Sequence, residues 1–333
     1  MSAPGGSAGG PAGRAAGRPT VRPDGRPTGR ATGAGPAARE TVEVTRPTTG
    51  TVVLARELRR AATARGWVTA PLPGVVLLSR GLRADPDTLA TYAQLVGEEV
   101  RDVLPAGYLH TLAFPLGTAM MARADFPLPA LGMVHVTNRI EVRRAVGVDE
   151  VLDGRVHVEN LAPHRRGTTV DVVSELATDG EVVWRGVSRY LVKGVRLPGA
   201  EPPEAAERPT WVAPEPTGQW RLGSDVGRRY AAVSGDGNPI HTSRLAARAF
   251  GFARPIAHGM FTAAKALADV GAAARGGAYA WDVEFATPVL LPATVSVRVA
   301  REQTSGGAPA SDGFAFAVWS RKPHLTGTVR PLA

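Results

Sequence analysis

The chain contains no cysteine, and this absence excludes disulfides, thiolate nucleophiles, cysteine-ligated zinc and iron–sulfur clusters. Aromatic residues amount to only 6%, whereas a nucleic-acid reader concentrates aromatic and basic residues on one element. No apolar run reaches the length that spans a bilayer, and the N-terminus lacks the hydrophobic stretch of a secretion signal. We therefore expect a cytoplasmic protein with no membrane span and no nucleic-acid partner, whose chemistry comes from aspartate, histidine and backbone groups.

The N-terminal segment has few large apolar residues. Residues 1–46 are rich in Gly, Pro, Ala, Thr and Arg, and their seven arginines against three acids give +4 of the chain's net charge of +9. Such a composition cannot bury enough surface to offset the entropy of ordering. We expect residues 1–46 to be a disordered tail, while the remaining chain is long enough for about two domains of ordinary size.

The most informative stretch is the run Tyr230-Ala-Ala-Val-Ser-Gly-Asp-Gly-Asn-Pro-Ile-His241. Asp236 and His241 are five residues apart, and Pro239 fixes its own φ while excluding the preceding residue from the α region. The segment between them therefore cannot be regular helix. A loop of this kind can aim a carboxylate and an imidazole at one point, so we interpret it as an active-site loop.

This run resembles the signature of the MaoC-like, or type 2 enoyl-CoA hydratase, family: an aromatic residue, a short apolar stretch, then S-G-D-x-N-P-[LIV]-H. Every position is filled, and residues 254–261, Arg-Pro-Ile-Ala-His-Gly-Met-Phe, resemble the family's entry into its central helix. A solvated Asp/Asn/Pro loop would account for the first match but not for both in order. The resemblance implies a hotdog fold and reversible, R-specific hydration of trans-2-enoyl thioesters.

The resemblance also implies roles for particular residues. Asp236 and His241 would activate water and relay its proton to C2, with Asn238 supporting the pair; the sequence does not decide which of the two is the base. The backbone N–H of Gly259, at the start of the next helix, would bind the thioester carbonyl. Ser234 would cap the turn that precedes the aspartate.

Other polar residues near the motifs have two interpretations each. His258 is either a substrate contact or a residue that forms hydrogen bonds at the helix start. Arg244, Arg248, Arg254 and Lys265 could reach pantetheine or phosphate, although solvated side chains are the favoured interpretation. We expect no metal and no cofactor, since the acyl group arrives as a thioester of CoA or of an acyl-carrier protein.

An internal repeat places residues 92–99 beside residues 230–237, with Tyr, Ala and Gly in register. Glu98 stands where the second copy has Asp236, and no histidine follows it five residues later. The first copy has therefore lost the chemistry, and we expect one active site per chain. Asp102 and His110 lie eight apart and are interpreted as structural.

Each copy continues from a helix of small residues into strand-like runs, which predicts an α+β fold. With the resemblance, this indicates a double hotdog whose halves pair within the chain, with further homodimerisation left open. The expected domains are a degenerate hotdog at residues 75–197, a linker at 198–216 and a catalytic hotdog at 217–333. The predicted strands cover residues 134–144, 155–161, 168–176, 182–192, 281–289, 294–300, 313–320 and 325–329.

Two other functions compete with an enoyl-thioester hydratase or 3-hydroxyacyl-thioester dehydratase. A hotdog thioesterase also binds acyl thioesters, but normally offers a carboxylate without the Asn-Pro-x-His arm. A non-catalytic acyl-thioester binding partner has a precedent in the degenerate first half. The intact pair of Asp236 and His241 argues against the second alternative.

Overall fold

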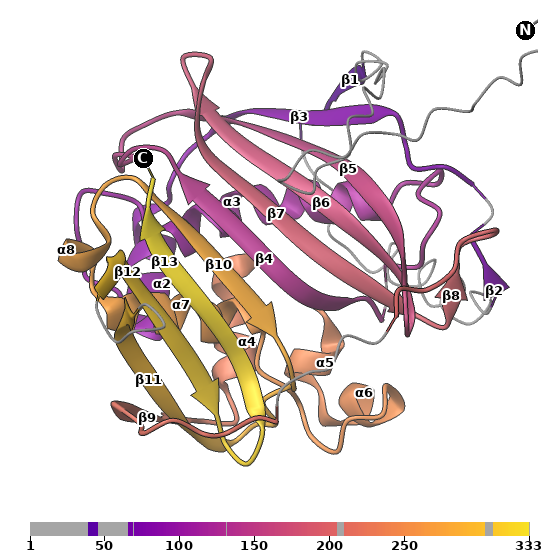
Figure 1. Ribbon diagram of the computed structural model, residues 1–333. Coiled ribbons are helices and arrows are strands. Elements are labelled where there is room, and N and C mark those ends of the chain that lie inside the picture. The colour runs from indigo at the N-terminus through magenta and orange to yellow at the C-terminus, as the bar shows by residue number, and fades with distance from the viewer. Residues whose placement is uncertain are drawn as a thin grey trace, which may run out of the picture. The chain divides into compact units, whose positions relative to one another are not determined.

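One order of elements occurs twice along the chain: a strand leads into helices, and the helices lead into four strands (Figure 1). The computed structural model describes residues 39–45, 66–68, 70–130, 132–204, 210–303 and 309–332. The first half comprises β1 (Glu40–Glu43), β2 (Gly66–Trp67), β3 (Val75–Leu82), α2 (Pro86–Val96), α3 (Ala106–Met121), β4 (Val134–Val142), β5 (Leu152–His164), β6 (Gly167–Thr178), β7 (Glu181–Lys193) and β8 (Val195–Arg196). The second half comprises β9 (Gly218–Leu222), α4 (Val226–Ser234), α5 (Pro239–Thr242), α6 (Arg244–Ala249), α7 (Gly259–Val270), α8 (Ala272–Arg275), β10 (Tyr279–Phe285), β11 (Ala293–Gln303), β12 (Pro309–Trp319) and β13 (Pro323–Pro331).

The strands of both halves form one 11-stranded sheet in the order β1-β3-β5-β6-β7-β4-β10-β13-β12-β11-β9. From the centre outwards, the first half runs β4-β7-β6-β5-β3 and the second runs β10-β13-β12-β11-β9, which is the same order of equivalent strands. The halves meet where β4 pairs antiparallel with β10, with Tyr279 opposite Val142 and Glu284 opposite Thr137. This is the double hotdog arrangement expected from the sequence, joined edge to edge.

A central helix packs on the sheet in each half. Eleven of the 16 residues of α3 are buried, Leu109 and Met120 completely. Its counterpart α7 is rich in alanine and buries Phe261 and Leu267. Helices that are apolar almost all round gain stability only when they are enclosed, and removing a single buried leucine side chain from such a core costs about 2–5 kcal/mol. The central helices therefore hold the adjoining loops in place.

The helices that precede the central ones also correspond. α2 ends at Gly97 (φ 81°) and α4 at Gly235 (φ 73°), both in the left-handed conformation that glycine adopts without strain. The rings of Tyr92 and Tyr230 on these helices lie 6.4 Å apart between centroids. The register that the sequence repeat assigned to the two openings is thus the register of the structure.

Three strands at the margins of the sheet differ from the sequence expectations. Glu40–Glu43 forms β1 and pairs in parallel with β3, so the expectation that all of residues 1–46 are disordered is wrong for this segment. Its side chains are mostly exposed, and the backbone hydrogen bonds to β3 hold it in place although it buries little apolar surface. Residues 1–38 and 46 lie outside the described part. β3 and β9 were not predicted as strands.

Candidate active site

The loop between α4 and α5 fixes Asp236 by short local hydrogen bonds. Ser234 Oγ donates to the carbonyl oxygen of Tyr230 (2.7 Å) and accepts from the backbone N–H of Asp236 (3.2 Å). The carboxylate oxygen Oδ1 of Asp236 accepts from the backbone N–H of Asn238 (3.2 Å), an Asx turn. The side chain of Asp236 remains 27% exposed. The loop thus holds a carboxylate in place without covering it.

Asn238 connects this loop to the short helix that carries His241. Its side-chain oxygen accepts from the backbone N–H of Ile240 (3.3 Å) and so caps α5, and Pro239 occupies the first helical position. His241 Nδ1 lies 2.9 Å from the carbonyl oxygen of Ile256. A carbonyl oxygen only accepts hydrogen bonds, so Nδ1 is the protonated nitrogen. In a neutral ring, Nε2 of His241 is then a free base.

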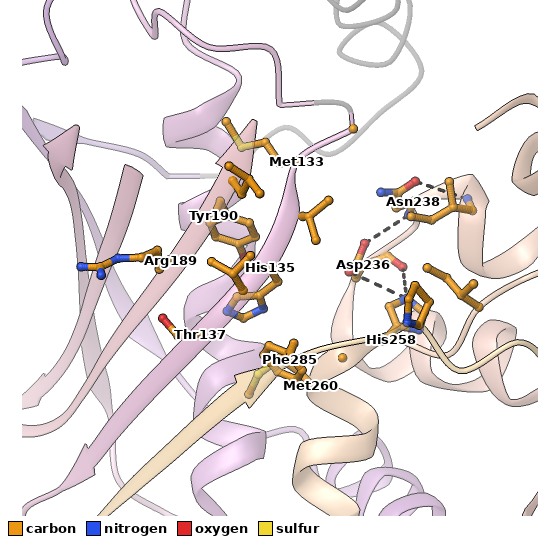
Figure 2. Close-up of a pocket in the computed structure, with 18 of the residues that line it drawn as sticks. Met133, His135, Thr137, Arg189, Tyr190, Asp236, Asn238, His258, Met260 and Phe285 are labelled. Atoms are coloured by element: carbon orange, nitrogen blue, oxygen red, sulfur yellow. Dashed lines mark hydrogen bonds and ion pairs between the residues drawn. The ribbon is translucent and has the colours of Figure 1, made fainter. Parts of the chain in front are cut away.

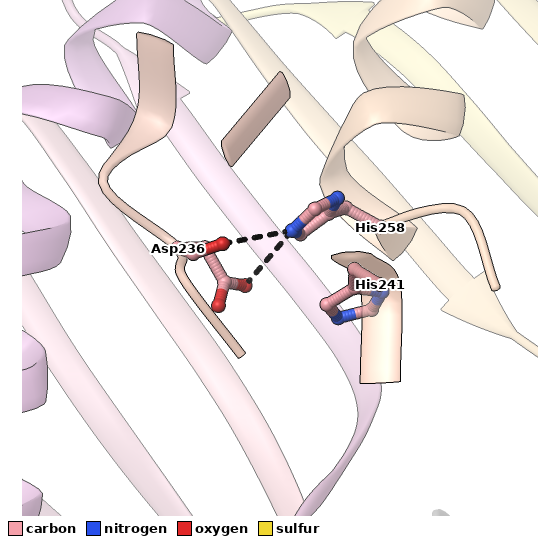
Figure 3. A group of neighbouring side chains, drawn as sticks. All are labelled: Asp236, His241 and His258. Atoms are coloured by element: carbon pink, nitrogen blue, oxygen red, sulfur yellow. Dashed lines mark hydrogen bonds and ion pairs between the residues drawn. The ribbon is translucent and has the colours of Figure 1, made fainter. Parts of the chain in front are cut away.

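His258 joins the loop to the central helix of the second half. It precedes the first residue of α7, and its Nε2 donates to the backbone oxygen of Asp236 (3.0 Å) and lies 3.8 Å from Oδ2 (Figure 3). Its ring stacks on that of His241 at 3.7 Å between centroids. His258 thus forms the hydrogen bond at the helix start that was one of its two sequence interpretations, and it also lines the cavity described below.

The electrostatics of the site keep both imidazoles neutral near neutral pH. Burial lowers the pKa of His241 below its usual value, against the opposing effect of the Asp236 carboxylate. Burial, followed by the proximity of His241, lowers the pKa of His258 to about 4. A neutral His241 beside a carboxylate can take up a proton and return it.

Gly259 begins α7, so its backbone N–H has no acceptor within the helix. A Cβ atom at this position would lie 3.0 Å from a ring carbon of Phe285. Only glycine therefore fits without displacing the aromatic ring. The helix dipole adds a partial positive charge at the same point, which favours an anionic oxygen.

These groups open into one cavity of about 1750 Å³ with walls from both halves (Figure 2). The second half contributes Asp236, His241 and Gly259, and the first half contributes residues of α3, β4 and β7. The volume exceeds the roughly 300–1,000 Å³ of ordinary small-ligand pockets. A long or branched acyl group fits such a space.

Two histidines of the first half line this cavity. His110, expected to be structural, faces it from α3, and burial lowers its pKa to about 4 with Asp236 close enough to oppose the shift. His135 on β4 stacks on Tyr190 (4.7 Å) and contacts Phe285 (4.9 Å between centroids). Its Nε2 has no hydrogen-bond partner among the described residues. His135 lies within the strand predicted at residues 134–144, but the register shift between His135 and Thr137 breaks the alternation that would have assigned its face.

Glu98 takes the place of Asp236 in the first half, directly after the left-handed Gly97. Its carboxylate accepts from the guanidinium of Arg275 at 2.6 Å, and both side chains are only 5% exposed. No imidazole occupies the position that corresponds to His241, where Val103 stands. The position equivalent to the catalytic loop is therefore closed by an ion pair.

The carboxylate and imidazole atoms of Asp236, His241 and His258 lie within 4.8 Å of one another. Two histidines and one carboxylate form a donor set that transition metals also use. In the neutral His258 ring, Nε2 carries the proton that is donated to the loop, so Nδ1 is the unprotonated nitrogen of this side chain.

Among the described residues, no helix is long and apolar enough to cross a membrane.

Comparisons with known proteins extend the resemblance from two motifs to most of the chain. Residues 201–312 match the profile of the MaoC like domain. The 3-hydroxyacyl-thioester dehydratase X of Mycobacterium tuberculosis is 39% identical over 278 residues, which are 83% of this chain and 96% of that protein. The crystal structure of HtdX from the same organism superposes with a TM-score of 0.66 at 36% identity, covering 77% of this chain and 100% of that one.

A more distant structure supports the fold alone. The MaoC-like dehydratase of Phytophthora capsici has a TM-score of 0.61 at 18% identity and covers 80% of this chain and 96% of its own. The loop, the helix start and the paired sheets thus occur together in a chain similar in sequence along most of its length to a named dehydratase. The chain belongs to the MaoC-like dehydratase family, in its double hotdog form.

Proposed function

We propose that this protein catalyses the reversible, R-specific dehydration of 3-hydroxyacyl thioesters to trans-2-enoyl thioesters. The observation that carries the proposal is the convergence of Asp236, His241 and the N–H of Gly259 on one cavity. The similarity to a 3-hydroxyacyl-thioester dehydratase of Mycobacterium tuberculosis supports the same reaction. The substrate is an acyl thioester, carried either by CoA or by an acyl-carrier protein.

In the hydration direction, His241 Nε2 acts as the base. Asp236 accepts a hydrogen bond from the water while Nε2 removes its other proton, and the resulting hydroxide adds to C3. The imidazolium formed is stabilised by the neighbouring carboxylate and then delivers its proton to C2. Dehydration reverses these steps: Nε2 removes the C2 proton and returns it to the departing C3 hydroxyl group.

The negative charge that gathers on the thioester oxygen needs a donor that is already oriented. The first amide of α7, that of Gly259, offers one at the positive end of the helix dipole. Removing an oxyanion donor of this kind costs about 10²–10³ in kcat. Because one imidazole serves both carbon atoms, the hydroxyl group and the C2 proton are added to the same face of the double bond.

No cofactor takes part in this scheme. The proton leaves and returns through His241, and no electron is transferred. The chain's own groups therefore account for every bond made or broken.

The experiment is incubation with crotonyl-CoA while absorbance of the conjugated thioester and free thiol are followed together. A hydratase bleaches the absorbance without releasing thiol, and separate assays with (R)- and (S)-3-hydroxybutyryl-CoA show that only the R isomer is dehydrated. Release of thiol would instead support a thioesterase. Neither change, with binding retained, would support a non-catalytic acyl-thioester binding protein.

A further inference from the structure

The short helix α6 presents an exposed surface formed by Arg244, Leu245 and Arg248. These residues lie one, three or four positions apart and therefore project from neighbouring parts of the helix. Both arginines are exposed, and Leu245 is 80% exposed. Among the described residues, neither arginine forms an ion pair. We refer to the three residues as the α6 surface.

The α6 surface adjoins the proposed active-site cavity. His241, on the preceding α5, lines the cavity, and so do Phe250 and Phe252, which directly follow α6. Ser243 connects the two helices and caps α6 through a hydrogen bond to the N–H of Ala246 (3.3 Å). In Figure 1, α6 lies at the margin of the second half beside α5. A partner that rests on α6 is therefore one helix away from Asp236 and His241.

The segment that carries α6 contains cations and no acids. No aspartate or glutamate occurs between Asp236 and Asp269, and three arginines, Arg244, Arg248 and Arg254, precede α7. Arg254 donates to the carbonyl oxygen of Pro292 (3.3 Å), which leaves its charge uncompensated. An acidic partner is attracted to this side of the cavity, and its association is accelerated by steering.

The exposed leucine distinguishes between two kinds of acidic partner. Phosphate groups of a free CoA need cations and amides, and an apolar side chain adds nothing to their binding. A protein partner, by contrast, buries an apolar residue at the centre of a contact whose charged groups form the rim. Leu245 beside Arg248 gives the α6 surface an apolar side chain next to its charged groups.

We propose that the α6 surface docks an acidic carrier protein, which delivers the acyl thioester on its phosphopantetheine arm into the cavity beside Asp236 and His241. This proposal rests on the proposed function and specifies the carrier for the same site. It separates the two sources of a phosphopantetheine thioester: the carrier protein uses the α6 surface, and CoA does not.

A second basic group provides a matched control. Arg165 and Arg166, in the turn between β5 and β6, and Lys193 at the end of β7 also line the cavity, from the first half. All three are exposed. Unlike the α6 surface, this group contains no apolar residue, and it belongs to the half that lacks the Asp236 loop. Charge reversal there tests whether any basic rim would suffice.

The experiment compares crotonyl-CoA with the crotonyl thioester of an acyl-carrier protein as substrates of the wild type, R244E/R248E, Leu245→Gln and R165E/R166E. We expect R244E/R248E to lower kcat/KM for the carrier-protein substrate about tenfold, and Leu245→Gln several-fold, with the CoA substrate unchanged. The preference of the wild type for the carrier-protein substrate over the CoA substrate should decrease as the salt concentration rises. It should be lost at about 1 M salt, where charges are screened within about 3 Å. Because Arg165 and Arg166 line the cavity itself, the R165E/R166E variant should change kcat/KM by the same factor for both substrates.

Calorimetry of the binding of the holo carrier protein, which carries the phosphopantetheine arm but no acyl group, tests docking without turnover. Equal losses on both substrates in R244E/R248E would overturn the proposal in favour of a phosphate site that both carriers share. A carrier-specific loss in R165E/R166E alone would place docking at the first half and also overturn it. Inactivity of the wild type on both substrates would instead contradict the proposed function, and the binding measurement would still decide whether α6 docks the carrier.

Discussion

In both halves a helix ends at a left-handed glycine that is followed by a carboxylate, but the two carboxylates have different surroundings. In the second half, Asp236 follows the left-handed Gly235, remains 27% exposed and faces a cavity beside two imidazoles. In the first half, Glu98 follows the left-handed Gly97, is 5% exposed and pairs with Arg275 at 2.6 Å. One backbone geometry thus supports either an accessible acid or a buried ion pair. Glu98 pairs with a cation of the opposite half, whereas the imidazoles beside Asp236 come from its own half.

The first half nevertheless contributes to the proposed active site. The wall opposite the loop is formed by His110, His135 and Tyr190. Burial lowers the pKa of His110 and raises the pKa of Tyr190, and the charge of Asp236 opposes the first shift and adds to the second. The sheet and the central helix of the first half thus form a wall of the cavity that the Asp236 loop of the second half faces. The second half alone would lack half of the cavity.

The largest effect is expected from the loop of the second half. Asp236→Asn retains the acceptor for the Asn238 N–H, and His241→Asn retains a donor for the Ile256 oxygen, so both keep the local hydrogen bonds while removing proton transfer. We expect kcat to fall by about 10²–10⁴ in each variant. Melting temperatures should stay close to that of the wild type. Turnover near the wild-type rate in either variant would contradict the assignment.

The same carboxylate position in the first half should affect stability instead of chemistry. Glu98→Gln leaves the Arg275 guanidinium buried without its counter-ion, and breaking a buried pair costs about 3–5 kcal/mol. We expect the free energy of unfolding in urea to fall by this order, with kcat per folded molecule unchanged.

Two further variants serve as controls for the Glu98 experiment. Arg330 pairs with Glu302 at 2.6 Å on a side chain that is 52% exposed, so Arg330→Gln should cost less than about 1 kcal/mol. The double variant E98L/R275M removes both buried charges and should recover much of the lost stability. A loss of turnover in Glu98→Gln as large as that of Asp236→Asn would mean that the two loops are not distinct in function.

Gly259→Ala should have a smaller effect on catalysis than the loop variants. The new Cβ lies 3.0 Å from the ring of Phe285, so either the ring or the start of α7 must shift while the amide itself remains. We expect kcat to fall about 10–100-fold with little change in KM, since the amide acts on charge that develops in the transition state.

Restoring space at residue 285 tests the steric cause. Phe285→Leu in the Gly259→Ala background should recover part of the lost kcat, whereas Phe285→Leu alone should not increase it. Absence of any recovery would show that the loss does not arise from this contact.

The sequence predicted that Asp236 and His241 lie close together, and the structure confirms this proximity because its determinants are local. Asp236 and His241 belong to one six-residue run that also contains the proline and asparagine that shape it. Most of the long strands were predicted because their apolar pattern is strong, although β3, with eight residues, was missed. In contrast, β1 and β9 have only four and five residues and receive their structure from a neighbouring strand.

Non-local pairs were beyond reach of the sequence. Glu98 and Arg275 are 177 positions apart, and the local sequence around either residue does not indicate that the two form an ion pair. His110 was interpreted as structural because no motif surrounds it, and only the pairing of β4 with β10 brings the wall of the first half to the loop of the second. The repeat identified the degenerate copy but not which of its residues line the cavity.

The smallest effect concerns the pH dependence of stability, to which both halves contribute. Burial lowers the pKa of His110 in the first half and of His258 in the second to about 4, below the value of about 6.5 in the unfolded chain. Between these pH values the unfolded state binds more protons than the native state. The stability due to the neutral rings is therefore complete above about pH 6.5 and decreases as the pH falls towards about 4.

Each of these histidines should contribute a slope of at most about 1.4 kcal/mol per pH unit within that window. His110→Gln and His258→Gln should each reduce the slope by about one proton, and the double variant should reduce it by about two because the side chains belong to different halves. Urea unfolding across the window measures the slopes. His157, on the outer β5 and only partly buried, is the control: its pKa is also lowered by burial, but Glu159 opposes the shift, so His157→Gln should change the slope less. Unchanged slopes in all the variants would contradict the neutral state of the buried imidazoles. They would also contradict a neutral His258 whose Nδ1 carries no proton.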